Sequence, residues 1–332
     1  MKQKRMITNR VMLKFGGSYL KPALGPPRGG APIVDLDDLV DDLVIPFDPK
    51  VIEECRTIPA DRLLQVGVTP SGHRLMLYRS HRPNPGSIEL LSITGYPVSW
   101  REPFIRSVEL FREIDRFLAE RYPNGFEDRI VPLKHNIYAA LHACPFDQVK
   151  VVIMGQDPYT TEIDGEPIGT GVAFAIRKGL RLKGLRAGSS LTGILAEVKR
   201  EYPNFRYDDT NCSLEGWLRQ GVLPLNASLT GERGSNDKAN SHKGKWRDFI
   251  YNILTYLVNN KKFCVFLAWG NEAKDIIGKV EMGNSFKVLT SAHPSGLATN
   301  AANPFFGNNH FSLCNESLIA NGHTPIDWTE IT

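Results

Sequence analysis

The sequence lacks the cysteine and histidine clusters that hold metals in proteins. Its five cysteines are far apart, at positions 55, 144, 212, 264 and 314, and no CxxC pair occurs. Zinc and iron–sulfur sites need such clusters, and disulfide-rich secreted domains need several paired cysteines. The pattern therefore predicts reduced, mostly buried thiols, with no zinc or iron–sulfur site.

Long apolar runs and a strong charge imbalance are also missing. The longest apolar stretches are short, such as Phe263–Trp269, and fall far below the length of a membrane-spanning helix. The N-terminus is basic but lacks the apolar core of a secretory signal, so we expect a protein that works inside a cell. The net charge of +4 does not by itself indicate a nucleic-acid partner.

The first 98 residues differ in composition from the rest. Residues 1–34 hold seven Lys or Arg and no acidic residue, and an acidic stretch follows from Asp35 to Asp48. We interpret residues 1–48 as a disordered arm; a partner-binding helix, a DNA-contacting arm and a targeting peptide are the alternatives. Residues 49–98 are interpreted as a small appendage, with a predicted β-hairpin formed by His73–Tyr78 and Ser87–Ile93.

From Trp100 onward, helical and strand patterns alternate. Short strands without polar alternation, separated by helices, are typical of a parallel sheet covered on both faces. We therefore predict an α/β fold, a three-layer α/β/α domain over residues 99–332 with a central, mainly parallel four-stranded sheet. The predicted helices are Val108–Arg121, Ser189–Glu201 and Lys245–Val258, and the predicted strands are Val149–Met154, Val222–Leu225, Phe263–Ala268 and Phe286–Leu289.

Polar residues follow these strands at the edge where open α/β sheets bind ligands. Asp157 follows the first strand, Asn226 the second and His293 the fourth. Because the carboxyl ends of parallel strands meet at one edge, we expect these three side chains to converge.

Four motifs at these positions resemble the family 1 uracil-DNA glycosylases. That family carries a water-activating GQDPYH loop, a uracil-stacking Phe in GLxFSV, an Asn in LLLNxxLT and an HPSPLS loop. The corresponding segments here are Gly155–Thr160 (GQDPYT), Gly171–Ile176 (GVAFAI), Leu223–Thr230 (LPLNASLT) and His293–Ala298 (HPSGLA). The resemblance runs from about Trp100 to Trp328. Thr160 stands where the family usually has His, and the loop Thr161–Pro167 is longer than usual.

The resemblance implies two catalytic residues. Breaking an N-glycosidic bond leaves positive charge on the sugar and negative charge on the departing base. Asp157 would orient the attacking water and offset the charge on the sugar, while His293 would donate a hydrogen bond to uracil O2. The structural alternatives are that Asp157 fixes a turn before Pro158 and that His293 is a satisfied core histidine.

Four residues are expected to bind the base. Asn226 can bond uracil N3–H and O4 together, whereas cytosine presents the opposite pattern. Phe174 would stack on the flipped base, and Tyr159 would exclude the thymine methyl group. Gln156, in the same loop, completes the predicted substrate-binding set. A turn role for Asn226 and core packing for Phe174 are the alternatives.

Three more residues are expected to grip DNA. Ser190 and Ser295 match serines that pinch the flanking phosphates, contacts that position DNA without reading its sequence. Leu297 matches the wedge inserted into the vacated base stack, with core packing as its alternative.

The resemblance thus implies a monomeric, cofactor-free uracil-DNA glycosylase that acts on DNA in base excision repair. A glycosylase for another modified pyrimidine and a glycosylase-like scaffold that binds DNA or a replication partner are the alternatives. We expect it wherever DNA is, in cytoplasm or nucleus, with organelle targeting left open. A protein partner of residues 1–98 is a further hypothesis.

Overall fold

The computed structural model describes residues 14–15, 18–19, 97–126, 128–235, 242–283, 285–295 and 302–332. The chain forms two compact units, Met1–Arg121 and Tyr122–Thr332. The sequence places the start of the glycosylase-like domain near residue 99, and this boundary stays a prediction. Among the described residues, no helix is both long enough and apolar enough to span a bilayer.

The first unit ends in two consecutive helices. The predicted helix Val108–Arg121 is confirmed as α5, whose apolar residues lie on one face, and the Phe104 and Phe111 rings pack 5.6 Å apart. The predicted hairpin at His73–Tyr78 and Ser87–Ile93 lies outside the described residues, as does most of the predicted arm. The described elements of this unit are β1 (Lys14–Phe15), β2 (Ser18–Tyr19), η2 (Val98–Trp100), α4 (Arg101–Arg106) and α5, and β1 pairs antiparallel with β2.

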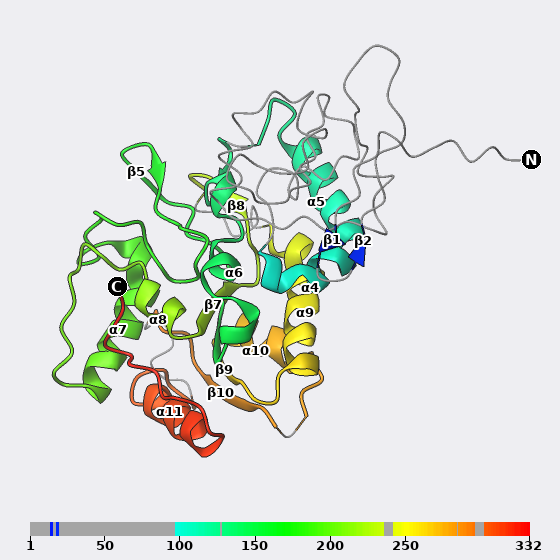
Figure 1. Ribbon diagram of the computed structural model, residues 1–332. Helices are drawn as coiled ribbons and strands as arrows, with labels where there is room; N and C mark the ends of the chain where they lie inside the picture. The colour runs from blue at the N-terminus through cyan, green and yellow to red at the C-terminus, as the bar shows by residue number, and fades with distance from the viewer. Residues whose placement is uncertain are drawn as a thin grey trace, which may run out of the picture. The chain divides into compact units, whose positions relative to one another are not determined.

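A four-stranded, fully parallel sheet forms the centre of the second unit. Its strand order is β10-β9-β4-β7, which confirms the predicted α/β fold. Every residue of the three strands β4, β7 and β9 is buried, so both faces of the sheet are covered (Figure 1). The four strands are β4 (Val151–Gly155), β7 (Val222–Asn226), β9 (Val265–Trp269) and β10 (Lys287–Ser291).

The fourth strand differs from the sequence prediction. We expected an apolar strand at Phe286–Leu289, but β10 spans Lys287–Ser291 and has only Leu289 and Ser291 buried. The physical reason is that one face of β10 is left open, so the side chains of Val288 and Thr290 on that face are exposed, whereas β7 at the opposite edge is buried throughout. Val288 accordingly remains 38% exposed.

The helices of the second unit complete the two outer layers. The rule of right-handed crossovers predicts the β4–β7 connection on one face of the sheet and the later connections on the other. In Figure 1, α7 accordingly lies on one side of the sheet and α9 on the other, and α11 lies on the side of α7, which it contacts. The helices are α6 (Ala139–Ala143), α7 (Ser189–Glu201), α8 (Glu215–Arg219), α9 (Lys243–Asn260), α10 (Asn271–Gly278) and α11 (His310–Ala320), with 3₁₀ turns η3 (Lys134–Asn136), η4 (Phe146–Gln148) and η5 (Arg186–Gly188).

Two short antiparallel pairs flank the main sheet. β3 (Ile130–Val131) pairs with β8 (Gly231–Glu232). β5 (Glu162–Ile163) pairs with β6 (Glu166–Pro167), so the long loop after the GQDPYT motif folds into a hairpin. Asp164 and Gly165 form its tip, both with positive φ, as tight hairpin turns require.

Candidate active site

Asn226 and Gly155 lie opposite each other at the carboxyl ends of two adjacent strands. A methyl group on Gly155 would lie 2.3 Å from the Asn226 Oδ1, so only glycine lets the amide lie against this strand. Asn226 is 4% exposed, and its amide makes no hydrogen bond to any residue that the structure describes. A nearly buried amide without a protein partner is suited to bind a ligand, because leaving it unpaired costs free energy.

The loop after β4 holds Asp157 beside this amide strand. The Ala227 N–H donates to the Gly155 carbonyl (3.0 Å), and the Ser228 N–H donates to the Gln156 carbonyl (3.0 Å). The Gln156 Nε2 donates to the Asp157 Oδ2 at 2.7 Å, which fixes the orientation of the carboxylate. Asp157 is partly exposed, so water and a sugar can reach it.

Tyr159 is held tightly in the same loop. Its hydroxyl oxygen is buried without a well-formed hydrogen bond, close to Ser190 and the Leu191 N–H at the start of α7. Burial raises the pKa of Tyr159, and these two neighbours offset only part of the rise. The phenol is therefore neutral, and its enclosed hydroxyl limits movement of the ring, as steric exclusion of a methyl group requires.

Phe174 is held in an unusual backbone conformation near the same strands. Its φ of 67° lies in the left-handed region, which costs non-glycine residues about 1–3 kcal/mol and is enriched at functional sites. The preceding Ala173 N–H donates to the Pro224 carbonyl of β7 at 3.1 Å. The Phe174 ring lies 6.2 Å from the Trp269 ring at the end of β9, so the phenyl group is fixed over the sheet edge.

His293 follows the edge strand and lies against the end of β9. A methyl group on Gly270 would come within 3.2 Å of the His293 Cβ. The Ser295 N–H donates to the His293 Nδ1 at 3.3 Å, and the Ser295 Oγ lies 2.9 Å from the same nitrogen. Because Nδ1 accepts the N–H, the neutral ring carries its proton on Nε2 and can donate from that side.

Thr160 links the loop after β4 to the turn after β8. Its hydroxyl donates to the Ser235 carbonyl, and the Gly234 N–H donates to the Thr160 carbonyl at 2.8 Å. The Arg233 side chain donates to Glu162 and to the Gly165 carbonyl of the β5–β6 hairpin. Arg177 donates to the Ile163 carbonyl at 3.1 Å, which ties the hairpin down from a second side.

The structure brings most of the predicted site residues to one edge of the sheet. Asp157 follows β4, Asn226 ends β7 and His293 follows β10, so all three lie at the carboxyl ends of the parallel strands, as expected from the sequence. Leu297 lies outside the described residues. The roles of all predicted site residues stay predictions. These residues are Gln156, Asp157, Tyr159, Phe174, Ser190, Asn226, His293, Ser295 and Leu297.

Sequence reasoning gave no role to Trp269. This residue is 2% exposed and contacts Phe174, and it ends β9 on the edge selected for chemistry. The sequence signal that could have identified it was an aromatic side chain at the carboxyl end of a parallel strand, where binding sites are commonly lined by aromatic residues. Among the described residues, no cluster of three or more His, Cys, Asp or Glu side chains could hold a metal ion.

Comparison with known proteins identifies the family. The family model described as "Uracil DNA glycosylase superfamily" matches residues 141–319. The chain belongs to the uracil-DNA glycosylase superfamily. It is 40% identical over 236 residues to a protein of Campylobacter fetus named "Uracil-DNA glycosylase", covering 69% of this chain and 91% of that one. A Dichelobacter nodosus protein of the same name is 42% identical over 195 residues, covering 58% and 77%.

A solved structure shows the same fold. The crystal structure of mimivirus uracil-DNA glycosylase superposes with a TM-score of 0.61 at 24% identity, covering 78% of this chain and 95% of that one. The superfamily assignment therefore agrees with the α/β architecture and with the four motifs at the strand ends.

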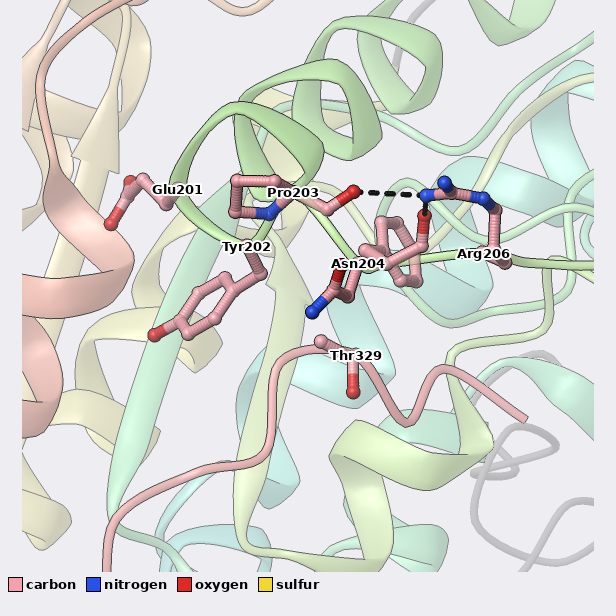
Figure 2. A pocket seen from close by; sticks show the side chains of 7 residues that line it. Glu201, Tyr202, Pro203, Asn204, Arg206 and Thr329 are labelled. Carbon is pink, nitrogen blue, oxygen red and sulfur yellow. Dashed lines mark hydrogen bonds between the residues drawn. The ribbon is translucent and has the colours of Figure 1, made fainter.

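A separate pocket lies at the other end of α7. Its volume is about 450 Å³, and Figure 2 shows Tyr202, Asn204 and Thr329 around it. Ser190 lies near the first turn of α7 and Tyr202 follows the last, so the pocket is about 18 Å along the helix from Ser190. Arg206 donates to the carbonyls of Pro203 and Phe205, so its guanidinium is already engaged there.

Proposed function

We propose that this protein is a uracil-DNA glycosylase that hydrolyses the N-glycosidic bond of a flipped-out deoxyuridine and leaves an abasic site in DNA. The observation that carries the proposal is the Asn226 amide, which is nearly buried and has no hydrogen-bond partner among the described residues, beside the GQDPYT loop in a chain of the uracil-DNA glycosylase superfamily. Base excision repair is the process that such a reaction serves.

In the proposed reaction, one residue stabilises the charge that develops on the sugar and another stabilises the charge that develops on the base. Asp157 orients the attacking water and stabilises positive charge on the sugar, with Gln156 holding its carboxylate. His293 donates from Nε2 to uracil O2, where negative charge develops as the bond breaks. The orientation of His293 by Ser295 supports this assignment.

The proposed selectivity comes from hydrogen bonding and shape. The Asn226 amide accepts from uracil N3–H and donates to O4, so cytosine would leave it unpaired at a cost of roughly 1–3 kcal/mol. Phe174 stacks on the base, and Tyr159 occupies the space of a thymine methyl group. Ser190, Ser295 and Leu297 are proposed to contact the DNA around the flipped nucleotide, and the protein to act as a monomer wherever DNA is.

Release of uracil from DNA tests the proposal. Purified full-length protein is incubated with single-stranded oligonucleotides that carry one uracil, cytosine, thymine or 5-hydroxymethyluracil, and abasic sites are cleaved with alkali. We expect cleavage only at uracil. Cleavage only at a different base would favour the alternative of a glycosylase for another pyrimidine, and DNA binding without cleavage at micromolar protein would favour a scaffold.

A further inference from the structure

A buried carboxylate on α7 lies behind the candidate site. Glu197 is 0% exposed and accepts one bifurcated hydrogen bond from the Gly307 N–H, at 3.1 and 3.0 Å to its two oxygens, and one from the Asn309 N–H at 3.4 Å. Arg200 donates to both of its oxygens, at 3.0 and 2.8 Å. Burial would raise the pKa of Glu197, but the hydrogen bonds from Arg200 and Gly307 outweigh it and lower the pKa. The carboxylate is therefore charged and fully engaged.

The segment held by Glu197 encloses Trp269 from two directions. Before the turn, the Phe305 ring meets the Trp269 ring edge-on at 5.1 Å. After the turn, His310 accepts a hydrogen bond at its Nδ1 from the Trp269 indole N–H at 2.9 Å. Glu197 binds the chain between these two contacts, so it fixes both at once. Trp269 in turn packs on Phe174, the predicted base-stacking ring.

We propose that Glu197 is a positioning residue for this aromatic wall, which we define as Phe305, Trp269 and Phe174. The inference rests on the proposed function, because it assumes that a base stacks on Phe174. Glu197 does not touch the base. Its carboxylate acts by fixing the turn at Gly307 and Asn309, so that the Trp269 ring supports Phe174 at one angle.

The same helix offers a matched control. Glu201 lies one turn further along α7, and its carboxylate accepts from the N–H groups of Phe311 and Ser312, at 3.3 and 2.7 Å. It therefore bonds backbone donors in the first turn of α11, directly after the turn that Glu197 binds and after Phe305 and His310. The Phe311 ring also meets the Trp269 ring at 5.9 Å. Glu201 does not, however, bind the turn at Gly307 and Asn309, so it separates general stability from support of that turn.

The test compares Glu197→Gln with Glu201→Gln in the full-length protein. For each variant, kcat/KM for uracil release from single-stranded DNA and the inhibition constant of free uracil are measured well below its melting temperature. Both variants are expected to melt earlier than the wild type. Glu197→Gln should lower kcat/KM and weaken inhibition by uracil, each by about three- to tenfold more than Glu201→Gln does, the range of one aromatic contact.

A second variant keeps the test decisive if Glu197→Gln does not fold. Phe305→Leu removes the edge-on contact with Trp269 without leaving a buried charge, and it should weaken uracil inhibition by a similar factor. In the double variant the two effects should not add, because they act through one contact network. Equal constants for Glu197→Gln, Glu201→Gln and the wild type, or an unchanged constant for Phe305→Leu, would overturn the inference. A wild type that releases no uracil would instead overturn the proposed function.

Discussion

At the scale of single residues, Asn226 is the residue that we propose decides which base is accepted. Its amide lies against Gly155 and has no partner among the described residues, so its pairing energy depends on the base. In the variant Asn226→Asp, a carboxylate can accept from the exocyclic amine of cytosine. We expect measurable cytosine release and a fall in uracil release of roughly ten- to a hundredfold. Alkali cleavage of matched uracil and cytosine oligonucleotides measures both.

Asn260→Asp is the control for this substitution, since its exposed amide bonds the Tyr256 carbonyl on α9 and lies away from the candidate site. It should leave the ratio of uracil to cytosine release unchanged. Loss of uracil release without any cytosine release in Asn226→Asp would count against Asn226 as the base-reading residue.

Asp157 is expected to affect the rate of reaction far more than the binding of DNA. Asp157→Asn keeps the shape of the side chain but removes the charge that offsets the developing charge on the sugar. Single-turnover rates should fall by about two orders of magnitude or more, with the DNA dissociation constant nearly unchanged by fluorescence anisotropy. Asp164→Asn, at the exposed hairpin tip, is the control. An unchanged rate would remove the proposed role of Asp157.

At the scale of secondary-structure elements, α7 supports the loop that carries His293. A methyl group on Gly193 would lie 1.9 Å from the Pro294 carbonyl oxygen, so helix and loop are in backbone contact. Gly193→Ala should force them apart, destabilise the protein by about 1–3 kcal/mol and lower kcat/KM for uracil release. Urea unfolding and steady-state kinetics measure the two effects.

Gly244 gives the matched comparison, because it is an exposed helical glycine on α9 with no atom near the position of a Cβ. There, Gly→Ala should stabilise the protein by up to about 1 kcal/mol without a change in kcat/KM. Similar effects at both glycines would show that the contact with Pro294 is not specific.

The β5–β6 hairpin is an element that was predictable from the sequence only in part. The extra length between Asp157 and Phe174 was visible in the sequence as the long loop Thr161–Pro167. Its fold was not predictable, because two-residue strands have almost no pattern of their own. It is held by Arg177, 14 positions from its partner Ile163, and by Arg233, 68 positions from its partner Gly165, and both meet it only in the folded chain.

At the scale of the whole molecule, stability should depend on pH through His310. Burial lowers the pKa of His310 to about 4 from its ordinary 6.5, with Glu197 opposing the shift. Between these values the unfolded state binds more protons than the folded state, so the free energy of unfolding falls as the pH drops from 6.5 to 4.

His310→Gln removes this titration while keeping an acceptor for the Trp269 indole N–H. Urea unfolding at several pH values should show a flatter decline in stability for the variant than for the wild type between pH 6.5 and 4. If the stability of the two proteins declined in parallel, unfolding would not be linked to proton uptake by His310 in this pH range, and the prediction would be wrong.

The sequence by itself determined the layered α/β fold and the order of its site motifs. Continuous apolar strands such as β4 and β9 must be buried on both faces, and their carboxyl ends must share an edge. That local logic was enough to group Asp157, Asn226 and His293. Only the tertiary structure decided the left-handed backbone of Phe174, the hydrogen bond from Thr160 to Ser235, and the hydrogen bonds that Glu197 accepts from the turn next to Trp269. These depend on contacts between residues far apart in the chain, and no local pattern of side chains encodes them.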